Sequence, residues 1–141
     1  MSVTPEEALV TKALAATGLT ALIGDRIYRE VAWTKNIKYP IVVTSIEESN
    51  SLSALNTVGG WVQAKIAFWI WAEDQRDVVP IAEQLRLALH CKKENVTVGT
   101  TTVKPTILLD SEESSSKVAE DGSEKLFYGI KQIYSVGMAQ A

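Results

Sequence analysis

Cysteine and histidine are almost missing from this chain of 141 residues, which has one of each, at the neighbouring positions His90 and Cys91. A single cysteine excludes a disulfide within the chain. One histidine and one cysteine also cannot supply the four ligands of a closed zinc site. The fold must therefore be held by its core, and we expect no metal and no cofactor.

Long apolar runs and basic clusters are missing as well. No run approaches the ~20 apolar residues needed to span a bilayer, and the first seven residues lack the basic start of a secretory signal. We therefore expect a protein made in a cytoplasm that does not enter a membrane. The net charge is −3. This argues against a dedicated DNA-binding protein, because such proteins usually carry a basic stripe.

The residues that are present predict one compact domain over 1–141. Hydrophobic residues make up 46% of the chain and charged residues 22%, a globular balance. Folding at this length buries roughly 70% of the unfolded surface, which is enough for an ordinary core. Neither an internal repeat nor an interdomain linker is recognisable.

The first part of the chain predicts a helix and then short strands. Thr4-Pro5-Glu6-Glu7 is a helix start, with Thr4 as cap and Glu7 closing a capping box, and Gly18 is a plausible stop. A turn over 19–23 is followed by a strand over 26–31. The β-branched run 41–46 predicts the next strand, and the polar stretch 47–56 predicts a loop or an exposed hairpin tip.

The segment 58–72 predicts a long strand with two different faces. One face holds an alternating apolar set: Val62, Ala64, Ile66, Phe68 and Ile70. The other face holds Trp61, Gln63, Lys65, Ala67, Trp69 and Trp71. The ten residue steps from Trp61 to Trp71, at roughly 3.3 Å each, make this strand about 33 Å long. It should therefore bend or project beyond the body of the domain.

The rest of the chain predicts a second helix and further strands. The helix should begin at Asp77 and end near His90, because a start at Asp74 would place Pro80 inside it. Strands are predicted over 96–103, 104–109 and 126–136, and the acidic, serine-rich stretch 110–124 predicts a long mobile loop. The fold class is α+β, with a mainly antiparallel sheet, two helices packed on one face and a long projecting strand or hairpin.

Candidate catalytic groups are sparse. His90 and Cys91 invite a nucleophile hypothesis, but neighbours at a helix end are expected to point in different directions, and a structural role is favoured. The paired carboxylates at 6–7, 47–48 and 112–113 lie where solvent is expected, so none has the desolvation that acid–base chemistry needs. We expect no catalytic residue.

The tryptophan-bearing face suggests a contact. A sheet with helices on one side leaves its other face in need of cover, and tryptophan is enriched at interface hot spots. Trp61, Trp69 and Trp71 are therefore the predicted subunit interface. Burial of these residues within one chain, and stacking of nucleic-acid bases on them, are the alternatives.

The order of motifs over most of the chain resembles the tail-completion, or tail-terminator, family of siphophages. The resemblance is carried by Leu22-Ile23-Gly24-Asp25-Arg26-Ile27-Tyr28, Tyr39-Pro40-Ile41-Val42-Val43 and Phe68-Trp69-Ile70-Trp71-Ala72. It continues in a helix ending Leu87-Ala88-Leu89-His90 and in the last strand, 127–134. The segment 33–38 and the acidic stretch depart from the family's pattern.

The resemblance implies a structural virion protein that catalyses nothing and works as a ring, which we expect to be a hexamer. It caps the tail tube, ends tube polymerisation and offers a surface to the head connector or stopper protein, while DNA passes through the lumen without specific binding. The virion is assembled in the bacterial cytoplasm. For the partner-docking loop we name Ser111, Glu112, Glu113, Glu120 and Asp121.

Other functions stay open at this point. A neck or minor tail protein of similar fold would attach to the connector instead of the tube. A small enzyme or ligand-binding domain would need a deep pocket with convergent polar groups, which nothing in the sequence predicts. A nucleic-acid-binding regulator would show salt-dependent binding.

Overall fold

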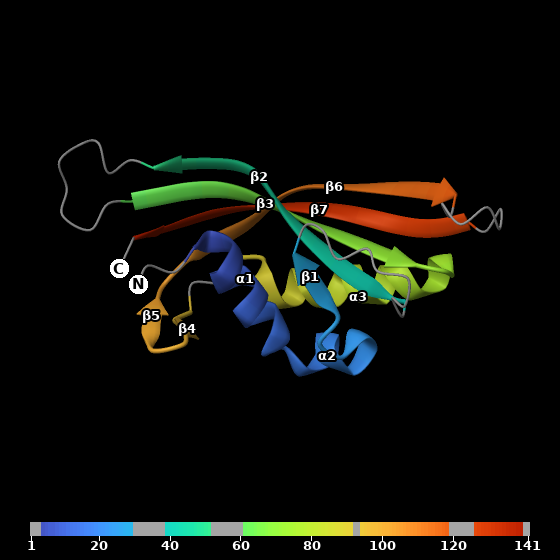
Figure 1. The fold of residues 1–141 in the computed structure, drawn as a ribbon, viewed down its shortest axis with the longest axis horizontal. Helices are drawn as coiled ribbons and strands as arrows, with labels where there is room; N and C mark the ends of the chain where they lie inside the picture. Colours follow the sequence, from blue (N-terminus) through green and yellow to red (C-terminus); the bar gives the residue numbers. More distant parts are fainter. Residues whose placement is uncertain (1–3, 30–38, 52–60, 92–93, 119–125, 140–141) are drawn as a thin grey trace.

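A computed structural model describes residues 4–29, 39–51, 61–91, 94–118 and 126–139. Its elements, in chain order, are α1 (Pro5–Leu14), α2 (Thr17–Ile23), β1 (Ile27–Arg29), β2 (Ile41–Ser51), β3 (Trp61–Ala72), α3 (Gln75–Leu89), β4 (Val96–Val98), β5 (Thr101–Val103), β6 (Thr106–Val118) and β7 (Leu126–Ala139). Figure 1 shows a long twisted sheet with the helices packed beneath it.

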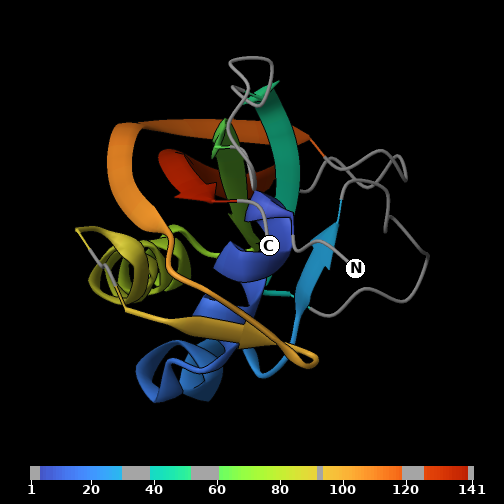
Figure 2. The same cartoon turned by 90° about the vertical axis from the view of Figure 1, so that its left-hand side faces the viewer.

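The main sheet has the strand order β1-β2-β3-β7-β6. Its pairs are antiparallel except for β1 and β2, which are parallel. The helices lie on one face of this sheet, and β4 and β5 form a separate small hairpin (Figures 1 and 2). The predicted α+β class with a mainly antiparallel sheet is confirmed.

The first helix starts where the sequence predicts. The Glu7 N–H donates to the Thr4 hydroxyl at 3.2 Å, and Pro5 is the first helical residue. The helix ends at Leu14, before the predicted stop at Gly18. Residues 19–23, predicted as a turn, belong instead to a further helix, α2, which begins at Thr17. Gly24 closes α2 with φ of 62°, a conformation that favours glycine.

Two strands are longer than predicted. β2 continues through residues 47–51, which were expected to be a loop, and β6 continues through Val118, into the predicted mobile loop over 110–124. Serine and glutamate have low strand propensity, but β6 pairs with β7 at every position from Ser111 to Val118. Backbone pairing in the sheet therefore overrides local composition. Glu120 and Asp121 lie outside the described residues.

The second long helix begins earlier than predicted. Asp74 is its cap and accepts from the Arg76 N–H at 2.9 Å, so Pro80 lies inside the helix. The prediction of a start at Asp77 is wrong because this cap outweighs the one backbone hydrogen bond that Pro80 removes. The stretch 96–103, predicted as one strand, is a hairpin that turns at Gly99, where φ is 63°.

The core lies between the sheet and the helices. The alternating apolar residues of β3 supply its centre, with Ile66, Phe68 and Ile70 fully buried. Leu85 and Leu89 of α3 pack in the same cluster. The predicted division of β3 into a helix-facing apolar face and an opposite face is therefore confirmed, and the opposite face is where the candidate site lies.

Candidate subunit interface

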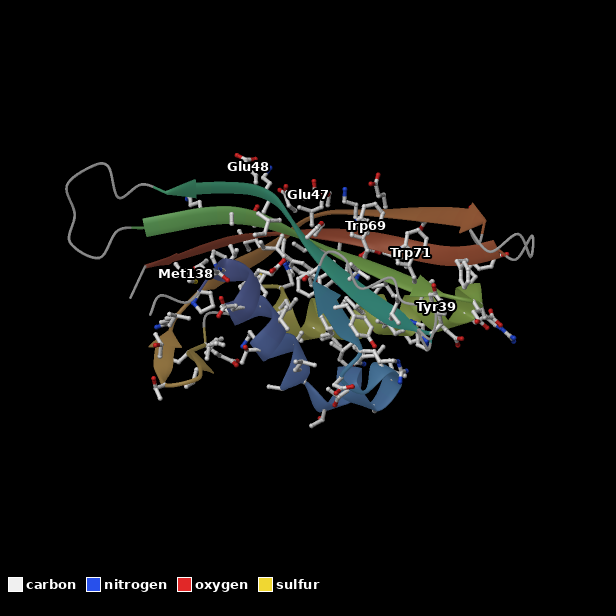
Figure 3. All side chains as sticks on the ribbon, viewed as in Figure 1. Tyr39, Glu47, Glu48, Trp69, Trp71 and Met138 are labelled. Carbon is white, nitrogen blue, oxygen red and sulfur yellow. The ribbon has the colours of Figure 1, made fainter. Side chains whose placement is uncertain are left out.

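The sheet face turned away from the helices, here called the helix-free face, carries an aromatic cluster at one end. Backbone register places its members side by side, because β2 pairs with β3 and β3 pairs with β7 at this level. Figure 3 shows the labelled members Tyr39, Trp69 and Trp71 at this end of the sheet. The aromatic cluster consists of Tyr28, Tyr39, Ile41, Val43, Trp69, Trp71 and Phe127.

Trp71 is largely buried by its own chain. Its exposed fraction is 8%, and its strand neighbour across the ladder is Gly129. A Cβ added at Gly129 would meet the Trp71 ring atoms Cε3 and Cζ3 at 2.6 Å, so the indole lies flat on the glycine backbone. Trp71 can therefore offer little area to another molecule, and glycine is required beneath it.

Trp69 is partly exposed and lies next to Trp71. The two rings are stacked, with centroids 5.9 Å apart and an interplanar angle of 3°. The Lys131 ammonium lies 4.6 Å from the centroid of the Trp69 ring and pairs with Glu47 Oε1 at 3.1 Å. Trp69 is thus the tryptophan of this cluster with surface left for a contact, and its environment is charged.

Tyr39 closes the other side of the aromatic cluster. Its ring stacks on Phe127 with centroids 4.6 Å apart. Burial, and secondarily the negative charge of Glu73, raise the pKa of the Tyr39 hydroxyl above its ordinary value. The sequence analysis did not single out Tyr39 or Phe127 as site residues, because they come from loop and strand segments far apart in the chain.

Trp61, the third tryptophan of the predicted interface, does not join this cluster. Trp61 is the first residue of β3 and pairs with Ala139 of β7. It lies eight residues before Trp69 on the same strand. At ~3.3 Å per residue this is about 26 Å. The predicted set of three therefore divides into Trp69 and Trp71 at one end of the sheet and Trp61 at the other.

Beyond the aromatic cluster the helix-free face becomes polar. Lys65 Nζ lies 3.3 Å from Asp110 Oδ2 across the sheet. A shallow hollow of about 330 Å³ follows, lined by Glu48, Gln63, Ala64, Lys65, Thr106, Leu108, Ser135, Val136 and Gly137. Leu108 is 49% exposed there.

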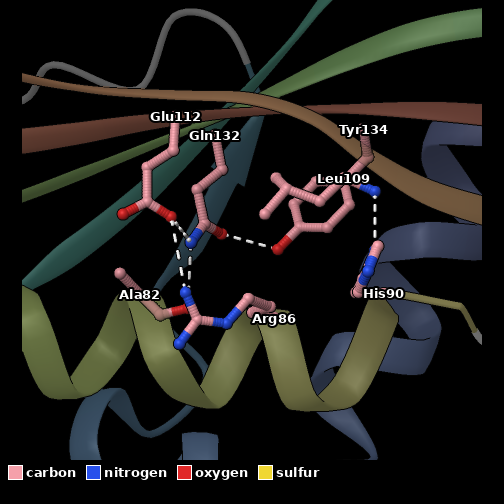
Figure 4. Close-up of polar contacts among 7 residues, drawn as sticks. All are labelled: Ala82, Arg86, His90, Leu109, Glu112, Gln132 and Tyr134. Carbon is pink, nitrogen blue, oxygen red and sulfur yellow. Dashed lines mark hydrogen bonds and ion pairs between the residues drawn. The ribbon is translucent and has the colours of Figure 1, made fainter.

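The residues of the predicted docking loop that are described, Ser111 to Glu113, lie on a strand. In the ladder, Glu113 lies opposite Lys131 of β7 on the helix-free face. Glu112 lies opposite Gln132 and points to the helices. In Figure 4 the Gln132 amide donates to Glu112 Oε2 and to the Ala82 carbonyl, both at 2.9 Å. Glu112 therefore ties β6 to α3.

Tyr134 completes this buried network. Its hydroxyl donates to Gln132 Oε1 at 2.6 Å (Figure 4). Burial, and secondarily the charge of Glu112, raise the pKa of the Tyr134 hydroxyl well above its ordinary value. Arg86 Nη1 lies 4.0 Å from Glu112 and partly offsets this effect. The network is a structural clamp between α3, β7 and β6.

His90 and Cys91 do point toward each other, contrary to expectation. Cys91 Sγ lies 3.3 Å from His90 Nε2, because Cys91 adopts a positive φ of 59°. His90 Nδ1 accepts from the Leu109 N–H at 2.9 Å. A neutral ring that accepts at Nδ1 carries its proton on Nε2, so it cannot act as a base toward the thiol. The pair holds the end of α3 against β6, as its favoured structural role requires.

The described residues hold neither a candidate metal site nor a membrane-spanning helix. In the described ranges, three or more His, Cys, Asp or Glu side chains nowhere gather in a way that could hold a metal ion. The helices in these ranges are all too short or too polar to cross a membrane.

Comparisons with known proteins give a likeness of fold. Neither a family profile nor a curated protein sequence matches the chain. Among solved structures, it is similar to a chain of the virion of a native gene transfer agent particle, with a TM-score of 0.65 and 13% identity. The match covers 96% of this chain and 94% of that one. At this identity the likeness establishes a shared fold that spans both chains almost completely.

Proposed function

We propose that this chain is a structural virion protein that forms a ring, a hexamer, at the end of a phage-type tail tube. The ring ends tube polymerisation and joins the tail to the head connector. The observation that carries the proposal is the fold shared with a chain of the gene transfer agent virion along 96% of this chain. The motif order of the siphophage tail-completion family supports the same role.

The surfaces of the described residues suit an assembly protein better than an enzyme. The helix-free face has Trp69 beside charged groups, and Lys131 links that ring to Glu47 on the neighbouring strand. A contact that combines an aromatic anchor with a polar surround is typical of protein interfaces. A ring that lets DNA pass also benefits from an acidic protein, because phosphates are repelled.

The test has a solution part and an assembly part. Light scattering after size-exclusion chromatography should give a mass of about 92 kDa, six times the 15.4 kDa chain. Negative-stain images should show rings. In a phage or particle whose own tail-completion gene is replaced by this one, tails of normal length should join heads.

The neck-protein alternative predicts a different partner. Tail-tube protein and connector protein, immobilised separately, should both retain this chain if it joins tail to head. Retention by the connector alone would support a neck protein, and retention by neither would contradict a joining role. Rings that bind DNA at low salt and release it at high salt would instead favour the nucleic-acid hypothesis.

The predicted docking residues are better tested by substitution than by deletion. A deletion across 111–122 would remove β6 from Ser111 to its end at Val118 and so could not separate folding from docking. Replacing Glu120 and Asp121 by serine leaves the described strands unchanged. If these residues dock the partner, the double substitution should lower head–tail joining and leave the ring mass unchanged. Unchanged joining would remove them from the proposal.

A further inference from the structure

Two stretches of the main sheet have no neighbouring strand on one side, in the part of the chain that the structure describes. β1 pairs with β2 at Val42, Val43 and Thr44, and among the described residues no strand lies beside β2 on this side from Ser45 to Ser51. β6 is the last strand at the other side of the sheet. Figure 1 shows that these two stretches also lie toward opposite ends of the sheet.

The first half of the β6 edge is closed by the end of α3. The Cys91 N–H donates to the Ile107 carbonyl at 2.8 Å. The Leu109 N–H donates to His90 Nδ1 at 2.9 Å, as Figure 4 shows. These bonds occupy the outward carbonyl of Ile107 and the outward N–H of Leu109. The open part of the edge therefore begins after the irregularity between Leu109 and Ser111 and runs from Glu112 to Val118.

The ladder registers show which backbone groups point outward. A residue is called outward here when its backbone N–H and C=O point away from the neighbouring strand, toward the open edge. Outward residues alternate along an antiparallel strand, and a bulge shifts the alternation by one residue. On β6 the outward residues before the bulge are Ile107 and Leu109, so after it they are Glu112, Ser114, Ser116 and Val118. On β2 the Val42 N–H bonds outward to Arg26, and the bulge between Ile46 and Glu48 makes Ile46, Ser49 and Ser51 the later outward residues.

We propose that the open edge of β6 in one copy pairs antiparallel with the open edge of β2 in a second copy, so that the sheet continues from subunit to subunit. This inference rests on the proposed ring. β2 and β6 run in opposite directions, because three antiparallel pairs separate them. Rotation about a ring axis therefore makes each joint antiparallel, and the two different edges make it head-to-tail, as a closed ring requires.

Side chains along the two edges favour a copy of this chain as the occupant. Ile46 is 50% exposed at the open β2 edge, where the next copy would cover it. In the register that sets position 118 beside Ile46, Lys117 comes opposite Glu47 and Glu48. A register four residues away would set Glu113 opposite the same two carboxylates, which like charges disfavour. Serines at 114–116 leave room for another backbone to approach.

The joint is staggered along the strands, which suits ring closure. The open part of β2 lies at one end of the sheet and the open part of β6 at the other (Figure 1). A constant stagger between neighbouring strands makes them tilt relative to the ring axis, as in closed barrels, where tilts of about 35–45° are usual. Each copy then satisfies one edge of each neighbour, and long unpaired edges disappear.

Proline substitution tests the joint without touching the sheet of the single subunit. Ser114→Pro and Ser49→Pro each remove an outward N–H, and proline is tolerated at such edge positions. Both variants should keep the wild-type circular dichroism spectrum and lose the ring, leaving mainly 15.4 kDa species in light scattering. Ser114→Ala and Ser49→Ala, the matched controls, keep the N–H and should form rings.

Mixing the two proline variants gives the sharpest result. Ser49→Pro retains a sound β6 edge and Ser114→Pro retains a sound β2 edge, so an equimolar mixture should form heterodimers, twice the mass of the chain, and no rings. Rings of normal mass from either folded proline variant would overturn the inference. If those rings also fail to join heads and tails, the edge serves another virion protein. A wild-type chain that forms no ring in solution or on tails would instead contradict the proposed function.

Discussion

The two faces of the main sheet bury aromatic residues for different purposes. On the helix-covered face, Phe68 and Tyr134 are fully buried and meet edge to face, with ring centroids 5.6 Å apart. On the helix-free face, Trp69 and Trp71 stack in parallel, Lys131 lies over the Trp69 ring, and Trp69 stays partly exposed. The first face holds the fold, while the second covers itself incompletely and leaves charged and aromatic surface exposed.

The difference separates the face that holds the fold from the face that the proposed assembly would use. The helix-covered face has three helices to exclude water, in the described ranges, and satisfies its polar groups in a closed network around Gln132. On the helix-free face, the Trp71 ring packs against the backbone of Gly129 and not against a helix. Substitutions on the two faces should therefore differ in size and in what they affect.

The largest effect is expected at Phe68. Phe68→Ala removes a fully buried ring between sheet and helices, and should lower the free energy of unfolding by about 3–5 kcal/mol. Urea denaturation followed by circular dichroism measures the change. Ile46→Ala on the open edge of β2, where the side chain is half exposed, is the comparison and should change stability far less. Equal losses would show that the two surfaces are not distinct.

A smaller effect is expected on the helix-free face at Gly129. A methyl group there meets the Trp71 ring at 2.6 Å, so Gly129→Ala should cost about 1–3 kcal/mol by overpacking and shift the tryptophan fluorescence. Combining it with Trp71→Leu should remove most of the cost, because the smaller side chain leaves room. A cost that stays the same in the double variant would mean that the ring is not the cause.

Tyr134 adds a pH dependence that belongs to the helix-covered face. Because its pKa is raised in the folded state, the folded protein holds the phenol proton more tightly than the unfolded chain does. The stabilisation that the Tyr134 hydroxyl gives the folded state is therefore complete below about pH 10, the pKa of tyrosine in the unfolded chain. This stabilisation is lost as the pH rises above that value. Tyr134→Phe should cost about 1 kcal/mol at pH 7 and flatten the decline above pH 10.

Measurement of unfolding free energy between pH 7 and 11 checks this expectation. Tyr39→Phe is the matched comparison on the helix-free face, because that hydroxyl also has a raised pKa but is less buried. It should change the alkaline decline less than Tyr134→Phe. A larger change from Tyr39 would reverse the comparison of the two faces.

The smallest stability effect is expected at Lys131. Its ion pair with Glu47 and its contact with Trp69 lie near solvent, where such interactions contribute about 0–1 kcal/mol. Lys131→Met keeps most of the side-chain volume and should leave unfolding nearly unchanged. If this face makes subunit contacts, ring assembly should weaken and lose its salt dependence, which light scattering at two ionic strengths would measure.

Local patterns predicted the parts of the fold that local forces decide. The Thr4 cap with Pro5 fixed the start of α1, and the alternation along β3 assigned every residue between Gln63 and Trp71 to its face. The same alternation led to the prediction that Trp69 and Trp71 belong to a subunit interface. The neighbouring Tyr39, Phe127 and Gly129 were not predicted to join this pair, because they come from two other segments of the chain that only the tertiary structure brings beside β3.

The sequence by itself determined the class of the fold, the face on which each residue of the longest strand lies, and the residue types that make catalysis and metal binding unexpected. Only the tertiary structure decided that residues 111–118 are a strand, that Asp74 starts α3 despite Pro80, and that α3 closes half of the β6 edge through His90 and Cys91. The reason is that helix caps and side-chain alternation act over a few residues. Strand pairing and edge capping instead depend on backbone groups from distant segments, whose partners no local pattern specifies.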